Sequence, residues 1–165
     1  MNGFFHSAYR FFPTEELTPR GWLRRQLEIQ AEGLSGHLHE VWPDIRDSAW
    51  IGGHAEGWER VPYWLDGFLP LAYLLRDERL IQTARRYLEA IMDAQQADGW
   101  ICPCKPEDRA HYDTWAVILI CKVLMVYHSC SGDERAVTTA LRAMENLFVH
   151  LQSHTPVQLG TEPLV

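Results

Sequence analysis

The sequence predicts an all-α protein built from helical hairpins of the kind found in (α/α) barrels, with about two and a half hairpins present. Apolar residues recur at helical spacing in several segments, and nearly wholly apolar segments alternate with amphipathic ones. The tripeptide Asp-Glu-Arg stands at residues 77–79 and again at 133–135, each time between a segment of the first kind and one of the second. Repeated helix pairs of this length indicate stacked or ring-closed hairpins, whose inner helices are apolar all round and whose outer helices face water on one side.

The first predicted helix spans residues 19–34, with Thr18 as its N-cap and Pro19 in its first turn. Residues 35–59 follow without steady periodicity and contain several glycines, which predicts a long ordered loop. Long loops in compact domains are usually functional, and we expect this one to form the rim of a site.

The second predicted helix, residues 61–75, has Pro62 in its first turn and an internal Pro70, which is expected to kink it. Asp77 is the predicted N-cap of a third helix, residues 78–96, because an apolar stripe at helical spacing begins just after it. These two helices form the first complete hairpin of the prediction.

A fourth predicted helix, residues 113–129, is apolar on nearly all sides and is therefore expected to be buried. A fifth, amphipathic helix follows Asp133 and runs to about Leu151. Its apolar positions are expected to form its core face, and they are Val137, Ala140, Leu141, Met144, Leu147 and Phe148.

Length and composition fit one globular domain. The chain has 165 residues and a mass of 19.1 kDa, and its 47% apolar and 22% charged residues exclude global disorder. The expected organisation is an N-terminal extension over residues 1–16, a partial barrel segment over residues 17–152 and a flexible tail over residues 153–165.

Charge and motifs exclude several classes of function. The formal net charge of −7 disfavours nucleic acid and anionic membrane surfaces as partners. No stretch reaches the ~18 consecutive apolar residues of a membrane span, the first residues lack the pattern of a signal peptide, and four sparse cysteines favour reduced thiols. No phosphate loop, dinucleotide fingerprint or serine elbow is present. We therefore expect a soluble cytoplasmic protein.

The segment GWERVPYWLDGFLPLAY, residues 57–73, mixes aromatic and charged side chains in its first half before it turns apolar. A buried helix has little use for Glu59, Arg60 and Asp66 among tryptophan and tyrosine side chains. A sugar site needs this mixture, because aromatic faces cover the C–H side of a sugar ring and charged groups bind its hydroxyls. The segment therefore predicts the wall of a carbohydrate site.

Four strings in the chain resemble the start of the catalytic domain of glycoside hydrolase family 127, the bacterial β-L-arabinofuranosidase-like enzymes. They are LTPRGWLRRQLEIQAEGLSGHLHEVWPDI at residues 17–45, DSAWIGG at 47–53, GWERVPYWLDG at 57–67 and QQADGWICP at 95–103. The resemblance runs from about Leu17 to about Gln152. It implies an (α/α)6 barrel that hydrolyses L-arabinofuranosides or related plant-type sugars, with this chain as the N-terminal portion of that domain.

In the resembled family the acid/base is a glutamate and the nucleophile is a cysteine in a zinc-bound site, and both lie beyond the end of this chain. We therefore assign no catalytic residue, metal ligand or cofactor to the chain, and zinc is expected only in the full-length family. The residues expected to contact a saccharide are His54, Trp58, Glu59, Arg60, Tyr63, Trp64, Asp66, Asp113 and Trp115.

Asp113 and Trp115 stand just before the fourth helix, as the cluster at residues 58–66 stands at the start of the second. Inner helices whose N-termini meet at one end of a barrel would bring both clusters to one cleft. The helix dipoles would favour electron-rich oxygens there.

Each of these residues has a structural alternative. Glu59 could instead cap the second helix, and Asp66 could form an ion pair with Arg60. His54 either contacts substrate or is a solvated loop residue, and Trp50 either stacks on a sugar or pins the loop.

Cys102, Cys104 and His111 are a weak candidate for a zinc site, because zinc usually takes four ligands in pairs spaced by two to four residues. The alternative is two ordinary loop cysteines.

Two functions from different classes follow. The leading hypothesis is the N-terminal portion of a glycoside hydrolase that supplies one wall of a saccharide-binding cleft. The alternative is a stand-alone, non-catalytic module that binds carbohydrate or pairs with other helices. In either case we expect the apolar faces of the inner helices to bind a second copy or a complementing chain.

Overall fold

The computed structural model describes residues 12 and 14–154, and all regular structure in this range is helical. The predicted all-α class is therefore confirmed for the described part of the chain. The elements, in order, are η1 (Thr14–Glu16), α1 (Gly21–Glu32), α2 (Leu34–Val41), α3 (Pro43–Arg46), η2 (Ala49–Ile51), α4 (Arg60–Leu75), α5 (Glu78–Asp93), η3 (Pro106–His111), α6 (Trp115–Ser131) and α7 (Glu134–Ser153).

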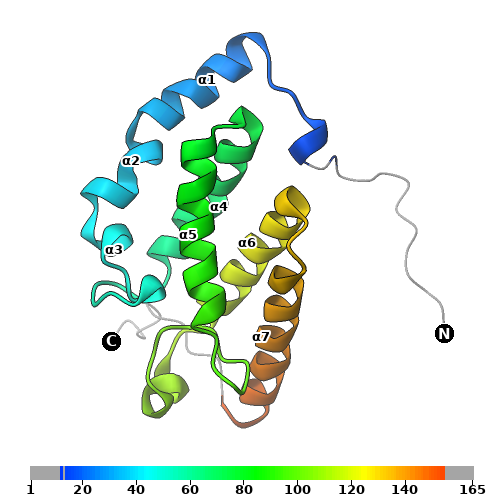
Figure 1. Cartoon of the computed structure of the whole chain (residues 1–165). Helices are drawn as coiled ribbons and strands as arrows, with labels where there is room; N and C mark the ends of the chain where they lie inside the picture. The colour runs from blue at the N-terminus through cyan, green and yellow to red at the C-terminus, as the bar shows by residue number, and fades with distance from the viewer. Residues whose placement is uncertain (1–11, 13, 155–165) are drawn as a thin grey trace, which may run out of the picture.

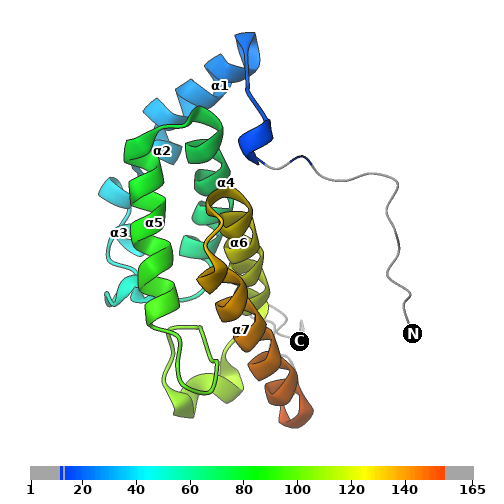
Figure 2. The ribbon, with the colours of Figure 1, turned by 45° about the vertical axis from the view of Figure 1, so that its right-hand side comes forward.

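The four longest helices form two consecutive antiparallel pairs, α4 with α5 and α6 with α7 (Figures 1 and 2). Helix α4 also packs on α6, so the two pairs lie side by side. Helices α1, α2 and α3 form an arc against the other side of α4, and η1 contacts α4 and α6. Among the described elements, the first pair thus has neighbours on both sides, whereas the second pair has its main neighbours on one.

The N-terminal arc differs from the prediction. Helix α1 begins at Gly21 with Arg20 at the N-cap position, so Thr18 and Pro19 do not start it. Helices α2 and α3 lie mostly in the stretch from residue 35 on that was expected to be loop. A Cβ on Gly36 would lie 1.8 Å from the carbonyl oxygen of Ala31, so only glycine allows this close approach of the two helices.

Helices α4 and α5 begin close to their predicted starts. Helix α4 continues through Pro70 to Leu75. The side chain of Asp77 accepts a hydrogen bond from the backbone N–H of Leu80 at 3.2 Å, which confirms it as the N-cap of α5. Helix α5 ends at Asp93, three residues before the predicted end.

Helices α6 and α7 confirm the fourth and fifth predicted helices, and Asp133 caps α7 as expected. Most of α6 is buried, but Trp115, Ile118 and Met125 are about half exposed. On α7 the expected core face was wrong in part, because alanines and Leu147 face the core. Leu141, Met144 and Phe148 are instead exposed at 60%, 45% and 68%.

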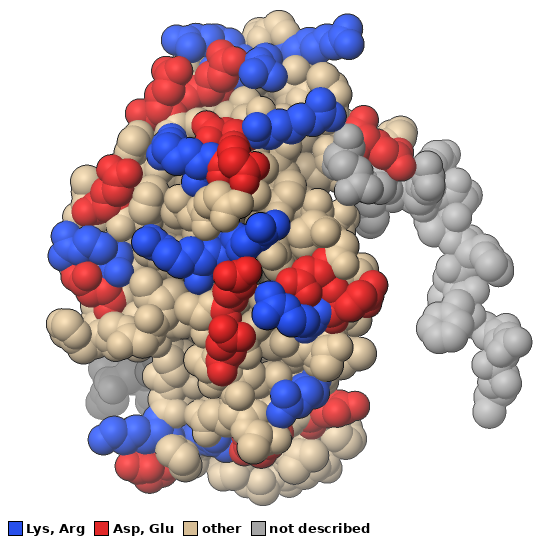
Figure 3. Space-filling view, in the orientation of Figure 1, with Lys and Arg blue, Asp and Glu red and all other residues tan. Residues whose placement is uncertain are grey.

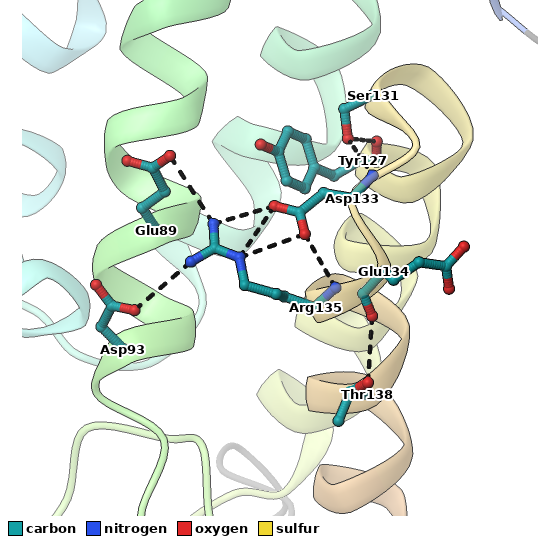
Figure 4. A network of polar contacts seen from close by, with 8 residues as sticks. All are labelled: Glu89, Asp93, Tyr127, Ser131, Asp133, Glu134, Arg135 and Thr138. Atoms are coloured by element: carbon teal, nitrogen blue, oxygen red, sulfur yellow. Dashed lines mark hydrogen bonds and ion pairs between the residues drawn. The ribbon is translucent and has the colours of Figure 1, made fainter.

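Polar contacts join the two pairs. Arg135 binds the cap residue Asp133 at 3.0 Å and reaches across to Glu89 and Asp93 of α5 at 3.9 and 4.0 Å (Figure 4). Figure 3 shows this face of the molecule, where basic and acidic side chains are interspersed over α5 and the adjoining edge of α7.

Among the helices in the described range, none is long and apolar enough to cross a membrane. The predicted flexible tail lies, from residue 155 on, outside the described residues, as do residues 1–11 and 13 of the predicted extension.

Candidate functional site

An open pocket of ≈ 390 Å³ lies at the first turn of α4. It is lined by Leu38 and Trp42 from α2 and its C-terminal end, and by four residues of the predicted site, Glu59, Arg60, Tyr63 and Trp64. Helix α4 places these four residues together because positions three and four apart share a face of a helix.

One wall of the pocket is fixed by packing. Trp64 is only 7% exposed, and its indole stacks on Phe68 with ring centroids 4.4 Å apart. The indole N–H of Trp64 donates to the backbone carbonyl of Ser35 at 3.1 Å, which ties α4 to α2. This wall can therefore present an apolar edge without moving.

The rest of the lining combines an aromatic ring with charges. The guanidinium carbon of Arg60 lies 5.6 Å from the ring centroid of Trp42, within the range of a cation–π contact. The carboxylate of Glu59 lies 3.8 Å from the same guanidinium. Hydrogen-bond donors and acceptors thus stand beside an aromatic face.

Tyr63 connects this pocket to α6. It is 50% exposed, and its hydroxyl accepts a hydrogen bond of 3.2 Å from the indole N–H of Trp115, which is 45% exposed. One turn further along, Lys122 of α6 donates to Asp66 of α4 at 2.8 Å. We call the set the α4–α6 surface, and it comprises Trp42, Glu59, Arg60, Tyr63, Trp64, Asp66, Trp115 and Lys122.

The two clusters predicted to meet at one end of the helices do so. The hydroxyl of Tyr112, in the loop before α6, donates to the carbonyl of Gly57, in the loop before α4, at 2.6 Å. Burial raises the pKa of Tyr112 far above its ordinary value, so the phenol keeps its proton and donates at any physiological pH. The tie holds the two loops together beneath the α4–α6 surface.

The structural roles predicted as alternatives for Glu59 and Asp66, a helix cap and an ion pair, involve other partners in the structure. Glu56, and not Glu59, caps α4: its carboxylate accepts the backbone N–H groups of Glu59 at 2.7 Å and Arg60 at 3.3 Å. Asp66 pairs with Lys122 and not with Arg60. The carboxylate of Glu59 is therefore not used as a cap and remains at the pocket.

Three expected contact residues lie elsewhere. Asp113 is 7% exposed and its carboxylate accepts the backbone N–H of Trp115 at 2.9 Å, so it shapes the start of α6. Trp58 packs against the core, and its carbonyl accepts the indole N–H of the buried Trp50 at 2.9 Å. Trp50 thus pins the loop, and His54 is an exposed residue of that loop outside the pocket.

The cysteine loop has a structural role. Cys102 is buried, and burial raises its thiol pKa well above the ordinary range, as it does for the half-buried Cys104. Within the described residues, no group of three or more histidine, cysteine, aspartate or glutamate side chains is placed to hold a metal ion, and this applies to Cys102, Cys104 and His111.

Sequence reasoning missed Trp42 and Lys122. A signal existed for each: Trp42 precedes a proline that occupies the first turn of α3, and Lys122 stands 56 positions after Asp66, the same offset that separates the caps Asp77 and Asp133. Aligning the two helix pairs by that offset would have placed Lys122 level with Asp66.

Within the described residues, fold and site together define an all-helical arrangement with an aromatic and charged pocket between the C-terminal end of α2 and the first turn of α4. The chain matches no family model, no curated protein and no solved structure. The resemblance to glycoside hydrolase family 127 that the sequence strings suggest stays a prediction.

Proposed function

We propose that the α4–α6 surface binds a saccharide and forms one wall of the substrate cleft of a glycoside hydrolase resembling the β-L-arabinofuranosidases. The observation that carries this proposal is the hydrogen-bonded pair Tyr63 and Trp115, half exposed beside a pocket whose walls are aromatic and charged. Exposed aromatic rings of this kind lose water at little cost when a sugar ring covers them.

The roles divide by chemistry. Trp42, Tyr63 and Trp115 offer faces for the C–H side of a sugar ring, while Glu59 and Asp66 accept hydrogen bonds from its hydroxyls. Lys122 and Arg60 donate to ring or hydroxyl oxygens. Because the ion pair between Asp66 and Lys122 holds a donor and an acceptor 2.8 Å apart, one hydroxyl can bind both groups.

The finer architecture belongs to the same proposal. Two consecutive antiparallel helix pairs, with α4 and α6 adjacent, are what the start of an (α/α)6 barrel would contain. In this arrangement α4 and α6 are inner helices, and the α4–α6 surface faces the cleft. Glycosidic hydrolysis requires a proton donor and a base or nucleophile, and we propose that both come from other parts of such a domain. The chain itself is proposed to bind sugar without cleaving it.

Calorimetric titration with methyl β-L-arabinofuranoside, with L-arabinose as a second ligand, tests the binding. Asp66→Asn should weaken binding by about 1.5–3 kcal/mol, or roughly 10- to 150-fold, because a hydrogen bond to a charged group is lost. Glu145→Gln on α7 is a matched control that should leave affinity unchanged. Unchanged affinity in Asp66→Asn together with a lowered melting temperature would assign Asp66 to structure alone.

A stand-alone helical interaction module is the second candidate. It is favoured by the exposed apolar side chains of α6 and α7. It predicts no saccharide binding by the wild-type chain, so the same titration separates the two candidates.

A further inference from the structure

The α6–α7 pair carries an uncovered apolar stripe on the side that faces away from α5. The side of α7 next to α5 is polar: Arg135 reaches Glu89 and Asp93, and Arg142 donates to the carbonyls of Gln96 and Ala97. On the opposite side, exposed apolar side chains follow one another along both helices. They are Ile118 (49% exposed), Met125 (46%), Leu141 (60%), Met144 (45%), Phe148 (68%) and Leu151 (39%).

The α7 part of the stripe has the spacing of a helix–helix seam. Leu141, Met144, Phe148 and Leu151 follow one another by three, four and three residues, which keeps them on one line along the helix. No charged residue stands at these positions. A second helix packed along the line would bury them without burying a charge.

Comparison of the two helix pairs shows that cover is missing from the second. Residues 56 positions apart occupy equivalent places, as the caps Asp77 and Asp133 do. In the first pair the equivalents of three exposed stripe residues are buried: Leu69 at 0% against Met125, Leu88 at 0% against Met144, and Met92 at 8% against Phe148. The equivalents of Leu141 and Leu151 are Arg85 and Gln95, which are only partly buried. The first pair has neighbours on both sides. The second pair therefore presents a surface that no element within residues 14–154 covers.

The area of the stripe fits one particular kind of occupant. Side chains of this size expose roughly 100 Å² each when they are half exposed, which gives on the order of 600 Å² for the six residues of the stripe. That is a large apolar patch for a monomer. A standard interface buries about 800 Å² per partner, and about 65% of a homodimer interface is apolar, so it needs roughly 500 Å² of apolar area, which the stripe can supply.

We propose that the occupant is a second copy of this chain, related by a two-fold axis, with α7 packed antiparallel on α7 of the partner and α6 at the edge. A two-fold interface uses the same patch twice, so the patch must complement itself. A seam with alternating spacings of three and four residues does so, because it meets the same pattern when it is reversed. The α7 seam lies outside the α4–α6 surface, whereas Ile118 of α6, at the edge of the interface, stands between Trp115 and Lys122 of that surface.

Light scattering and sedimentation of the full chain at micromolar concentration test the proposal. The wild-type chain should have twice the 19.1 kDa mass of one chain and should dissociate on dilution. Phe148→Glu should raise the dissociation constant roughly 100-fold or more, because the interface would bury an unpaired carboxylate. Val149→Glu is the matched control: Val149 is 66% exposed, one residue further and about 100° around the helix. This variant should remain a dimer.

Circular dichroism of both variants checks that α7 still folds, and Leu141→Glu at the other end of the seam provides a second test if Phe148→Glu does not fold. A monomeric wild-type chain overturns the proposal. So does a dimer that Phe148→Glu and Val149→Glu weaken equally, because the contact would then lie elsewhere on the molecule.

Discussion

His39 shows how one side chain couples the N-terminal arc to the core. It belongs to α2, its side chain is 10% exposed, and its ring stacks on Trp64 of α4 with centroids 5.8 Å apart. Burial lowers the pKa of His39 below 6.5, and this effect outweighs Glu40, which lies 3.5 Å away and raises it. The neutral imidazole is therefore the form that the folded arc accepts.

A pH dependence of stability follows from the lowered pKa of His39. Above pH 6.5 the ring is neutral in both states. As pH falls from 6.5 toward the folded-state pKa, the unfolded chain takes up the proton first, so the free energy of unfolding decreases. Urea unfolding at pH 7.5 and 5.5 measures this loss, and His39→Gln should reduce it. His150, whose pKa burial also lowers, is retained in both proteins, so the difference between them reports His39. An identical loss in His39→Gln would show that His39 is not responsible.

At the residue scale, the sequence predicted which of several side chains would lie together but not their hydrogen-bond partners. The prediction placed Glu59, Arg60, Tyr63 and Trp64 in one site, and the structure brings all four to one pocket. It failed for the cap of α4, because several carboxylates near a helix start compete for the same N–H groups and backbone geometry selects among them. Glu56 caps α4 because its carboxylate accepts two of these N–H groups.

At the element scale, the two Asp-Glu-Arg sequences are helix starts with similar backbone at the N-cap aspartate but different cap hydrogen bonds: Asp77 accepts the N–H of Leu80, three residues on, and Asp133 that of Arg135, two residues on. The carboxylate of Asp133 accepts the N–H of Arg135 at 2.9 Å and also pairs with its guanidinium (Figure 4). Asp133→Ala should lower the free energy of unfolding by about 1–2 kcal/mol, because a cap and its favourable interaction with the helix dipole are lost.

Glu134→Ala is the control for that measurement. Glu134 is the next residue and its side chain is 84% exposed, so its removal should change stability by less than about 0.5 kcal/mol. Chemical denaturation of the three proteins at one pH makes the comparison. Equal losses for the two variants would contradict the capping role of Asp133.

The long helices were predictable because periodic apolar residues and capping aspartates agree with each other. The short helices α2 and α3 were not, because segments of eight and four residues have little helical stability of their own and form by packing. Ile45 is fully buried, and its carbonyl accepts the hydroxyl of Tyr87 at 2.9 Å. That contact joins residues 42 positions apart, which no local pattern reveals.

At the scale of the whole molecule, the sequence predicted which helices would be neighbours but not which faces would stay uncovered. Amphipathic spacing on α7 was assigned to the core, yet the core takes its small residues and Leu147. The larger side chains Leu141, Met144 and Phe148 each come one residue after a buried one, and they lie about 100° further around the helix. A hydrophobic pattern reports that a face is buried somewhere, and it does not distinguish the interior of one chain from the contact between two.

A self-associating chain should show a melting temperature that rises with protein concentration, since mass action favours the folded dimer. Calorimetric scans over a hundredfold range of concentration measure the rise. Phe148→Glu should melt at a temperature independent of concentration. A wild-type melting temperature that does not change over this range would contradict dimerisation of the folded chain.

The hydrogen bonds that hold the N-terminal arc also determine when it can fold. Trp64 binds the carbonyl of Ser35, and Tyr87 binds that of Ile45, so both anchors are synthesised after the segments that they hold. During translation α1, α2 and α3 leave the ribosome with no surface to pack on until α4 and α5 have followed. Helices α1, α2 and α3 are therefore made before α4 and α5 but become protected only after them, and in that interval they are accessible to chaperones and proteases.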